Sequence, residues 1–388
     1  MTPTASIVGV GMTSMSTRDR SPEDMACEAA SEALHDAGMD AGDVGLVVFA
    51  NALGGRLADQ GCIRGQAWLR SLGLDHAGIV NVDNSCAGGS SALHLGYMSA
   101  LGGESPVLVV GAEKMWTGDR SATLAGIEDG LPASERAALR DTFDNGAKSV
   151  LMGLNADWVR VQIEQRSTTR QHLAATAVKA RRAGARNPLA QLREEVTIEE
   201  VLASPVVAGG LTRLMCSSFT DGAAAAVLAA GRHGSAPRIR TSIVRSGNGD
   251  LDYHQRLGET AELAWKSAGI VPGDLDLVEI HDATSAEELY ALESLGFYEP
   301  GDAGPATAAG DTEIGGSGIC VNPSGGLVAR GHPLGATGIC QVFELVLQLR
   351  EQAAGRQVPG ARLAAAVNTG GIIGGDAASV GIHVLEKG

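Results

Sequence analysis

The residue of the chain best suited to covalent chemistry is Cys86. It follows a short apolar run, residues 79–83, and small residues lead from it into a helical pattern. A cysteine at or near a helix N-terminus meets unpaired backbone amides and the positive end of the helix dipole, which favour the thiolate. Considered alone, Cys86 also fits a buried structural cysteine. Two histidines elsewhere in the sequence favour the interpretation as a nucleophile.

These histidines are His332 and His281. His332 lies in a glycine-rich turn ahead of a helical pattern that begins near residue 335, and His281 ends an apolar strand pattern. An imidazole at His332 can take the proton of Cys86 and stabilise the thiolate. A thiolate is a nucleophile that can attack a carbonyl carbon and form a covalent intermediate. The alternatives are a structural histidine in the turn and a histidine that caps the end of a strand.

Length and composition limit the class of protein. The chain has 388 residues, which is enough for two or three domains. Its net charge of −15 argues against general binding of nucleic acids. The six cysteines show neither paired nor zinc-ligand spacing, so we expect no metal, no disulfide framework and a cytoplasmic location. No apolar run reaches membrane-spanning length, and the N-terminus predicts a first strand instead of a signal peptide.

Strand and helix patterns alternate through the first part of the chain. Ser21, Pro22 and two following acidic residues predict the start of a helix that runs to about Asp36. The predicted strands are residues 6–10, 45–50, 79–83 and 107–111, and residues 60–72 have a helical pattern. This order predicts a parallel or mixed sheet with helices on both faces.

Residues 115–205 differ from their surroundings. The segment has no clear strand, has a helical pattern, and carries a concentration of basic residues. These are Arg160, Arg166, Arg170, Lys179, Arg181, Arg182, Arg186 and Arg193. One interpretation is a solvated helical face. The other is a cap over the sheet that receives an anionic ligand, such as a phosphate-bearing carrier.

The second part of the chain repeats the alternation. After a predicted strand at 223–229 and a boundary near 231–237, the predicted strands are 239–245, 275–280, 363–367 and 379–385, and the predicted helices are 260–268, 285–295 and 335–350. In both parts a small-residue turn presents a reactive side chain beside a helix start, Cys86 in the first and His332 in the second. We therefore predict a duplicated α/β unit, with one domain at 1–235, a second at 236–388, and a site between them.

The ordered set of motifs resembles the thiolase family, most closely the sterol carrier protein 2 type. The most specific stretch is 322–338, which contains the Gly-His-Pro sequence at His332, taken together with the turn around Cys86. The supporting stretches are residues 110–115, 214–226, 278–283 and 356–361. The resemblance extends along almost the whole chain. It implies an α/β fold of two similar five-stranded halves in five layers, αβαβα, with a helical loop domain inserted at about 115–205.

The resemblance also implies roles in stabilising an oxyanion. His281 matches the histidine that helps to hold the oxyanion of the incoming thioester or enolate. A tetrahedral intermediate at Cys86 needs two amide donors, and the Cys86 N–H is one candidate. The resemblance puts the other at Gly370, in a last glycine turn at residues 368–371.

The implied substrate is a CoA thioester, and no bound cofactor is expected. We expect the basic insertion to bind the CoA phosphates through Arg181 and Arg182. Ser324, in the most specific motif stretch, is a further residue expected to bind CoA. The resemblance also implies a homodimer.

The sequence departs from the family at one catalytic position. Thiolases carry a second cysteine that removes and returns a proton at the substrate α-carbon, and its two usual places hold Asn368 and Ala283. Neither side chain can carry a proton. Cys320 precedes the Gly-His-Pro sequence and is a further candidate, without a spacing argument in its favour.

We therefore predict a thiolase-like acyltransferase of lipid or secondary metabolism. It forms an acyl-enzyme on Cys86 from acyl-CoA and passes the acyl group to a carbon nucleophile, or catalyses the reverse. One alternative is a decarboxylative condensing enzyme. Another is a retro-aldolase that acts on a CoA thioester with a zinc-ribbon/OB-fold (DUF35-type) partner protein and does not need Cys86. A non-catalytic scaffold is the third, and it gives no chemical reason for Cys86, His281 and His332 to occur together.

Overall fold

Strands from both halves of the chain form one large sheet. In the computed structural model of the protein, residues 4–17, 19–142 and 149–388 are described, and ten strands of this part share a sheet. Their order is β10 (Cys320–Val321), β9 (Leu277–Glu279), β11 (Leu363–Ile373), β12 (Asp376–Glu386), β8 (Arg238–Ser246), β1 (Ala5–Met12), β7 (Gly222–Ala230), β4 (Val107–Glu113), β2 (Leu46–Ala50) and β3 (Gly78–Val82).

The sheet consists of two five-stranded halves of the same topology. Strands β3, β2 and β4 are parallel, and β7 and β1 follow antiparallel to their neighbours. Strands β10, β9, β11, β12 and β8 repeat this pattern in the second half. The halves meet edge to edge, where Ala5 and Ser6 of β1 pair with Ile239 and Arg238 of β8. The predicted duplication of an α/β unit is therefore present in the strand order.

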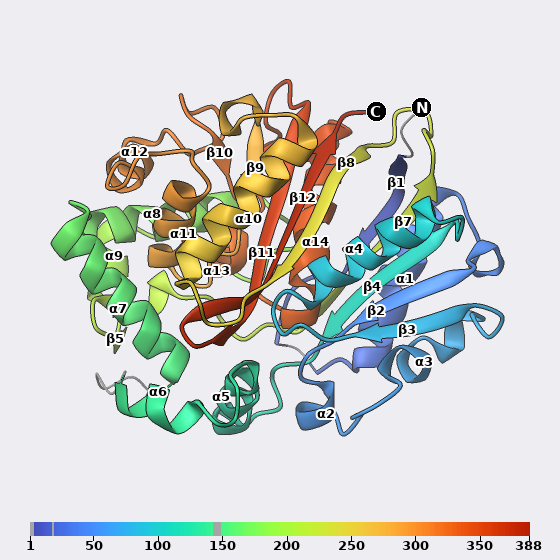
Figure 1. Cartoon of the computed structure of the whole chain (residues 1–388), viewed down its shortest axis with the longest axis horizontal. Coiled ribbons are helices and arrows are strands. Elements are labelled where there is room, and N and C mark those ends of the chain that lie inside the picture. The colour runs from blue at the N-terminus through green and yellow to red at the C-terminus, as the bar shows by residue number, and fades with distance from the viewer. Residues whose placement is uncertain (1–3, 18, 143–148) are drawn as a thin grey trace.

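Helices cover the sheet in matching places. Helix α1 (Pro22–Ala37) packs on β1 and β7, and α10 (Tyr253–Ala268) packs on the corresponding strands β12 and β8. Helices α4 (Gly88–Leu101) and α14 (Thr337–Leu349) pack on each other and on strands of both halves. Figure 1 shows α4 beside the seam between the halves, with both chain ends near the same corner. The mixed α/β thiolase fold expected from the sequence is confirmed.

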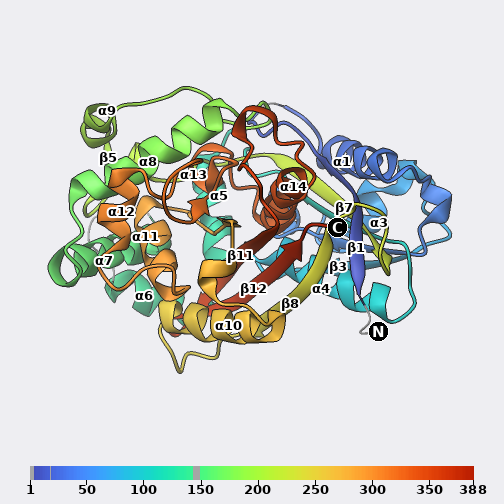
Figure 2. The ribbon, with the colours of Figure 1, turned by 90° about the horizontal axis from the view of Figure 1, so that it is seen from above.

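The segment predicted to be inserted consists of short and medium helices. They are α5 (Arg120–Ile127), α6 (Arg136–Thr142), α7 (Val150–Gln165), α8 (Arg170–Ala185) and α9 (Ile198–Ala203). Helices α7 and α8 pack on α11 (Ser285–Ser294), and α8 also packs on α12 (Ala303–Ala309) and α13 (Gly326–Ala329). The insertion from the first half thus lies against the second half, as Figure 2 shows from above. The remaining elements are α2 (Gly54–Leu57), α3 (Arg64–Trp68), β5 (Val206–Ala208) and β6 (Leu211–Thr212).

Most predicted elements are present, and the first helix illustrates why. Ser21 accepts a hydrogen bond from the Asp24 amide at 2.9 Å, and Pro22 occupies the first helical position. Both features satisfy the constraints of a helix N-terminus, so the sequence alone located the start of α1. The predicted domain boundary near residue 235 falls in the connection between β7 and β8 and stays a prediction.

Two predictions of local structure were wrong, and one strand was missed. The helical pattern at 60–72 forms only α3 and a separate 3₁₀ turn, Arg70–Leu72. The two-residue strand β10 was not predicted, because so short a strand has no periodicity. Residues 368–371 do not form the last glycine turn: they continue β11 and pair with β12, and the turn follows at Gly374 and Gly375.

A buried carboxylate connects the end of β4 to both halves of the chain. Glu113 is fully buried and accepts hydrogen bonds from the amides of Ala52 (2.9 Å) and Leu53 (3.0 Å), in the loop after β2. It also accepts one from the amide of Gly335 (3.0 Å), shortly after His332. Burial raises the pKa of Glu113 to about 7, although these amide donors oppose the shift. Glu113 thereby fixes the turn of His332 against the first half.

Replacing this carboxylate should destabilise the fold. Glu113→Ala leaves several buried amides without an acceptor, and we expect a loss of about 3–5 kcal/mol of unfolding free energy. Chemical denaturation measures this loss. The matched control is Glu104→Ala, which removes an exposed carboxylate and should cost less than about 0.5 kcal/mol. Equal costs for the two variants would contradict the role assigned to Glu113.

None of the helices in the described part of the chain combines the length and the hydrophobicity of a transmembrane span.

Candidate active site

Cys86 lies in a tight loop between β3 and α4. The preceding residue, Ser85, has a φ of 51°, a left-handed conformation that is uncommon outside glycine. The loop is closed by hydrogen bonds from the Ala87 amide to the Asn84 carbonyl (3.0 Å) and from the Gly88 amide to the Ser85 carbonyl (3.0 Å). Cys86 is partly exposed and precedes the first residue of α4, Gly88, by two positions. A strained turn that presents a nucleophile ahead of a helix is a recurrent arrangement in acyl transfer.

The structure brings the two predicted histidines to this cysteine. One ring nitrogen of His281, one of His332 and the Cys86 sulfur lie within 4.8 Å of one another. The rings of His281 and His332 meet edge to face, with centroids 5.0 Å apart. The three residues come from the loop before α4, the end of the β9 segment and the turn after α13, so only the tertiary fold assembles them.

A carboxylate that the sequence interpretation missed lies behind His281. Glu287 of α11 is almost fully buried, and its Oε1 lies 2.7 Å from His281 Nδ1. The same oxygen accepts a hydrogen bond from the Tyr253 hydroxyl at 2.6 Å. The other oxygen accepts from the Ala283 amide at 3.1 Å. A signal was available, because Thr284 and Glu287 have the spacing of a helix capping box, which turns the glutamate back toward the preceding strand.

These contacts determine the charge of His281. Burial by itself lowers the pKa of His281, but the charge of Glu287 and the neighbouring Cys86 sulfur outweigh it and raise the pKa to about 10. The Nε2 atom of His281 is buried, and a hydrogen bond between the ring and the Cys86 sulfur is one of the contacts that raise this pKa. His281 is therefore protonated near neutral pH, with one N–H on Glu287 and the other left for the site.

His332 has the opposite environment. Its Nδ1 lies 2.8 Å from Thr337 Oγ1, and that hydroxyl donates its own proton to the Pro333 carbonyl (2.9 Å). Nδ1 is therefore the donor, and Nε2 carries a lone pair. Burial, the charge of His281 and the charge of Arg330 lower the pKa of His332 well below its usual value. His332 is a neutral imidazole.

Gly370 lies directly against the cysteine loop. A Cβ atom at Gly370 would lie 2.4 Å from the Ala87 nitrogen and 2.4 Å from the Asn84 carbonyl oxygen. No larger residue fits this position without displacing the loop. The contact agrees with the expected place of Gly370, and its function as an oxyanion donor stays a prediction.

A cavity of about 200 Å³ opens above the three catalytic candidates. Its lining includes polar groups, among them Cys86, His281, His332 and Glu287. Its walls are mostly apolar and aromatic: Leu124 and Ile127 of α5, Leu151, Met152 and Trp158 of α7, and Ile372 of β11. Polar groups converging at one end of an apolar cavity are typical of a small-molecule site.

Arg120 borders the same cavity and was not predicted as a site residue. It is exposed at the start of α5, and its guanidinium lies 5.6 Å from the centre of the Phe219 ring. The ring of Trp116 also stacks with that of Phe219, with the two ring centres 6.4 Å apart. A cation beside aromatic rings can bind both phosphate and a purine base.

The three residues expected to bind CoA have other surroundings, and their role stays a prediction. Ser324 is fully buried, and its hydroxyl donates to Glu279 at 2.7 Å. Arg181 is also buried. Arg182 forms two hydrogen bonds with Glu313, at 2.6 and 2.8 Å. None of the three lines the cavity of Cys86.

Three of the other basic residues of the insertion are used in internal ion pairs. Arg160 pairs with Asp157 and Glu164, Arg166 with Glu293, and Lys179 with the buried Glu288. Because the matching acids lie on neighbouring turns or on the second half, the sequence of the insertion alone overstates its free positive charge.

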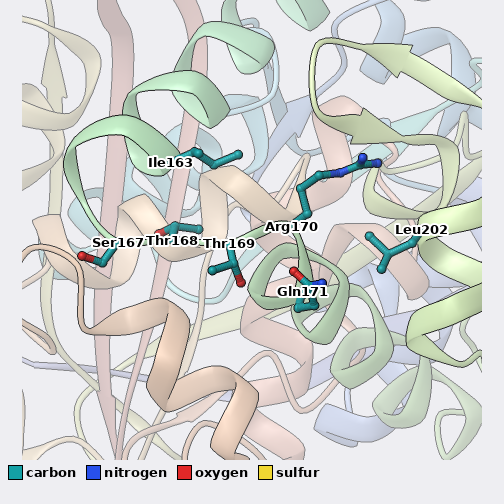
Figure 3. A pocket seen from close by; sticks show the side chains of 7 residues that line it. All are labelled: Ile163, Ser167, Thr168, Thr169, Arg170, Gln171 and Leu202. Carbon is teal, nitrogen blue, oxygen red and sulfur yellow. The ribbon is translucent and has the colours of Figure 1, made fainter.

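A second depression, of about 640 Å³, lies on the insertion. Figure 3 shows its lining residues, which extend from Ile163 at the end of α7 through Thr169 and Arg170 to Leu202 of α9. None of them lines the cavity of Cys86, so this depression takes no part in the chemistry at the cysteine.

The two positions that lack the second cysteine have different surroundings. Ala283 lines the cavity, whereas Asn368 is fully buried outside its lining. Cys320, the further candidate, is buried in β10 and does not line the cavity, and burial raises the pKa of its thiol to about 12. Cys216 does line it, but burial raises the pKa of that thiol to about 12 as well. Of the cysteines in the described residues, Cys86 and Cys216 line this cavity, and the raised pKa of the Cys216 thiol disfavours its thiolate.

The Cys86, His281 and His332 cluster also has the ligand types of a transition-metal site. The expected absence of a resident metal stays a prediction.

Comparisons with known proteins agree on one family. The model of the thiolase N-terminal domain matches residues 5–232, and that of the thiolase C-terminal domain-like family matches residues 245–384. An acetyl-CoA acetyltransferase of Methanothermobacter thermautotrophicus is 36% identical over 98% of this chain and 99% of that protein. Sterol carrier protein 2 of Oryctolagus cuniculus is 34% identical over 95% of this chain and 70% of that protein. The solved structure of an Ltp2-ChsH2(DUF35) aldolase has a TM-score of 0.80 at 21% identity and covers 99% of this chain and 98% of that chain.

The chain belongs to the thiolase family. The resemblance to its sterol carrier protein 2 type is confirmed, and the chain is an enzyme of the acyl-CoA acyltransferase class.

Proposed function

We propose that the protein transfers an acyl group from a CoA thioester to a carbon nucleophile, or catalyses the reverse, through an acyl-enzyme on Cys86. The observation that carries this proposal is the meeting of Cys86 with two imidazoles at the floor of an apolar cavity. A thiolate needs a proton acceptor beside it to form and a proton donor to release the CoA thiol. His281 and His332 lie within reach of both events.

The developing oxyanion would be held at the cysteine loop. We propose the Cys86 and Gly370 amides as its donors, since Gly370 lies in contact with the loop residues on either side of Cys86. A methyl group at Gly370 would displace this loop, so Gly370→Ala should slow acylation of Cys86 more strongly than it weakens binding of the thioester.

The cavity favours an acyl group larger than acetyl. Its volume is about 200 Å³, and an apolar cavity of ~150 Å³ is already able to hold a benzene ring. The walls from α5 and α7 offer no charged partner to a distal acyl group apart from the exposed Arg120 among the described lining residues. We therefore propose a medium-chain, branched or aromatic acyl group.

The acyl-enzyme can be observed directly. Incubation with hexanoyl-CoA should add one hexanoyl group to the protein in intact mass spectra, on the peptide that contains Cys86. Hexanoyl-CoA should form this adduct faster than acetyl-CoA, because its chain fills the apolar walls. The control is Cys86→Ala, which removes the nucleophile and should give no adduct. The proposal fails if wild type stays unmodified or if Cys86→Ala is modified equally.

The aldolase alternative is supported by the fold of the Ltp2-ChsH2(DUF35) aldolase. A retro-aldolase cleaves a carbon–carbon bond of the CoA thioester without forming an acyl-enzyme on Cys86. In this alternative, a zinc-ribbon/OB-fold partner of the DUF35 type would assemble with the chain. The same variant discriminates the two functions: turnover of a β-hydroxyacyl-CoA that survives Cys86→Ala in the presence of such a partner would favour the lyase.

We propose that CoA enters the cavity beside Arg120, and not beside α8, the helix that carries Arg182. Arg120 is exposed at the cavity, next to the ring of Phe219. Arg182 is already paired with Glu313. The pantetheine arm would then pass from the rim of the cavity to Cys86 at its floor.

Charge reversal at these two positions tests the entrance. Arg120→Glu should raise the KM for hexanoyl-CoA by about tenfold, the loss of one charged contact to a phosphate, and change kcat by less than about twofold. The matched control is Arg182→Glu, which reverses a basic residue of the same insertion. Steady-state kinetics measures both. A larger KM effect at Arg182 than at Arg120 would contradict this entrance.

We also propose a homodimer through the free edge of β3. This strand ends the sheet, and Val80 on it is 47% exposed, while Met98 on the adjacent helix α4 is 54% exposed. An unpaired strand edge with exposed apolar side chains favours pairing with another chain. Light scattering should give twice the mass of the chain, and Val80→Lys should shift it to the monomer. Leu263→Lys on α10, a comparably exposed leucine, should not. A monomeric wild type would refute the dimer.

A further inference from the structure

Glu287 stands beside the place where the second cysteine of a thiolase is missing. Its Oε2 accepts the hydrogen bond of the Ala283 amide, and its Oε1 lies 2.7 Å from His281 Nδ1. It lines the same cavity as Cys86 and is buried. A buried carboxylate that holds one nitrogen of an imidazole, while the other nitrogen faces a nucleophile, is the arrangement of a catalytic triad.

We propose that Cys86, His281 and Glu287 form such a triad, in which His281 alone carries the proton in both half-reactions. His281 and Cys86 are the catalytic residues, and Glu287 is a positioning residue that holds the imidazole and its charge. This inference rests on the acyl-enzyme proposed above. It revises the role predicted for His332, which becomes a neutral hydrogen-bond acceptor beside the sulfur.

The hydrogen bonds distinguish the two imidazoles. Nδ1 of His332 donates to the hydroxyl of Thr337, which is neutral and gains little from a positive ring. Nδ1 of His281 meets a carboxylate, which stabilises a positive ring strongly. The Tyr253 hydroxyl also donates to Glu287, and this second donor holds the carboxylate in place. The proton of Cys86 is therefore more stable on His281 than on His332.

The groups around His281 all agree with this assignment. Glu287 faces it from α11, with Tyr253 of α10 behind that carboxylate. Cys86 faces it from the loop before α4, and His332 faces it from the turn after α13. Two of these groups, the carboxylate and the thiolate, stabilise an imidazolium, and His332 is neutral.

In the first half-reaction, the resting pair is the Cys86 thiolate and the His281 imidazolium. The sulfur attacks the thioester carbonyl, and a new carbon–sulfur bond forms. When the tetrahedral intermediate collapses, the bond to the CoA sulfur breaks, and the leaving thiolate takes the proton from His281 Nε2. The products are free CoA, the acyl-enzyme and a neutral His281 still bonded to Glu287.

In the second half-reaction, the neutral His281 is the base. Its Nε2 takes a proton from the acidic carbon of a 1,3-dicarbonyl acceptor, or from the hydroxyl of a phenol, which then attacks through a ring carbon as its carbanion form. The carbanion attacks the acyl group, a carbon–carbon bond forms, and the bond to Cys86 breaks. The thiolate and the imidazolium are regenerated, so the proton balance closes without a second cysteine.

The test compares Glu287→Gln with wild type over about pH 6 to about pH 10, by the rate of acyl-enzyme formation from hexanoyl-CoA. Acylation needs a protonated His281, and a carboxylate raises the pH at which this proton is lost. The neutral glutamine should therefore move the alkaline limb of the profile lower by at least about one pH unit. Glu287→Asp, which keeps the charge, should restore most of the shift.

The matched control removes another buried carboxylate from the same helix. Glu293 of α11 pairs with Arg166 away from the cavity, and Glu293→Gln should leave the alkaline limb in place. The histidine signals of ¹⁵N-labelled protein give a second measurement. At about pH 9.5, most of the wild type should carry protons on both nitrogens of His281, and most of Glu287→Gln should carry a proton on only one.

The outcomes separate this inference from the function on which it rests. A wild type that forms no adduct refutes the proposed function, and the catalytic triad with it. A normal adduct with an unshifted limb in Glu287→Gln refutes the triad alone. A doubly protonated His332 in place of His281 refutes it as well and returns the proton to the residue that the sequence motif suggested.

Discussion

The close approach of backbone segments around Cys86 is the constraint on which the rest of the structure depends. A Cβ at Gly370 would lie 2.4 Å from the Ala87 nitrogen, and one at Gly335 would lie 2.6 Å from the Asn51 Cα. Strand β11 and the turn that follows His332, both in the second half, therefore contact the first half directly through backbone atoms. Such contacts need both halves in fixed positions, which the edge-to-edge join of β1 and β8 and the packing of α4 on α14 supply.

Buried carboxylates maintain these positions and, at one place, set the chemistry. Glu113 binds backbone amides from both halves, and Asp221 binds the amides of Met115 and Trp116 where the insertion begins. Each is a fixed charge or dipole inside a water-poor interior, where its hydrogen bonds are strong. Glu287 likewise accepts a hydrogen bond from a buried backbone amide, that of Ala283, but its other oxygen lies against His281. A structural device of this fold thereby becomes part of the candidate catalytic site.

The basic composition of the insertion is interpreted differently once its contacts are known. Its basic residues indicate an anion-binding cap when the segment is considered alone, yet Lys179, Arg166 and Arg182 pair with acids of the second half. These pairs hold the insertion over the cavity. The apolar sides of α5 and α7 then form the cavity walls, and the positive charge left at the rim is that of Arg120. The insertion thus contributes apolar walls to the cavity, while Arg166, Lys179 and Arg182 are used in ion pairs with the second half.

The sequence by itself determined the family, the order of strands and helices, and the candidates Cys86, His281, His332 and Gly370. The order of elements follows from period and capping residues, and the family and the site candidates follow from the resemblance of short motifs to known thiolases. Tertiary structure decided the rest, because charge depends on neighbours that are distant in sequence. Only the fold places Glu287 against one imidazole and Thr337 against the other, buries Ser324 and Arg181, and extends β11 through residues that look like a turn. The sequence motifs identify the candidate reactive groups. The hydrogen bonds of the folded protein determine which of the two imidazoles faces a carboxylate and which faces a hydroxyl.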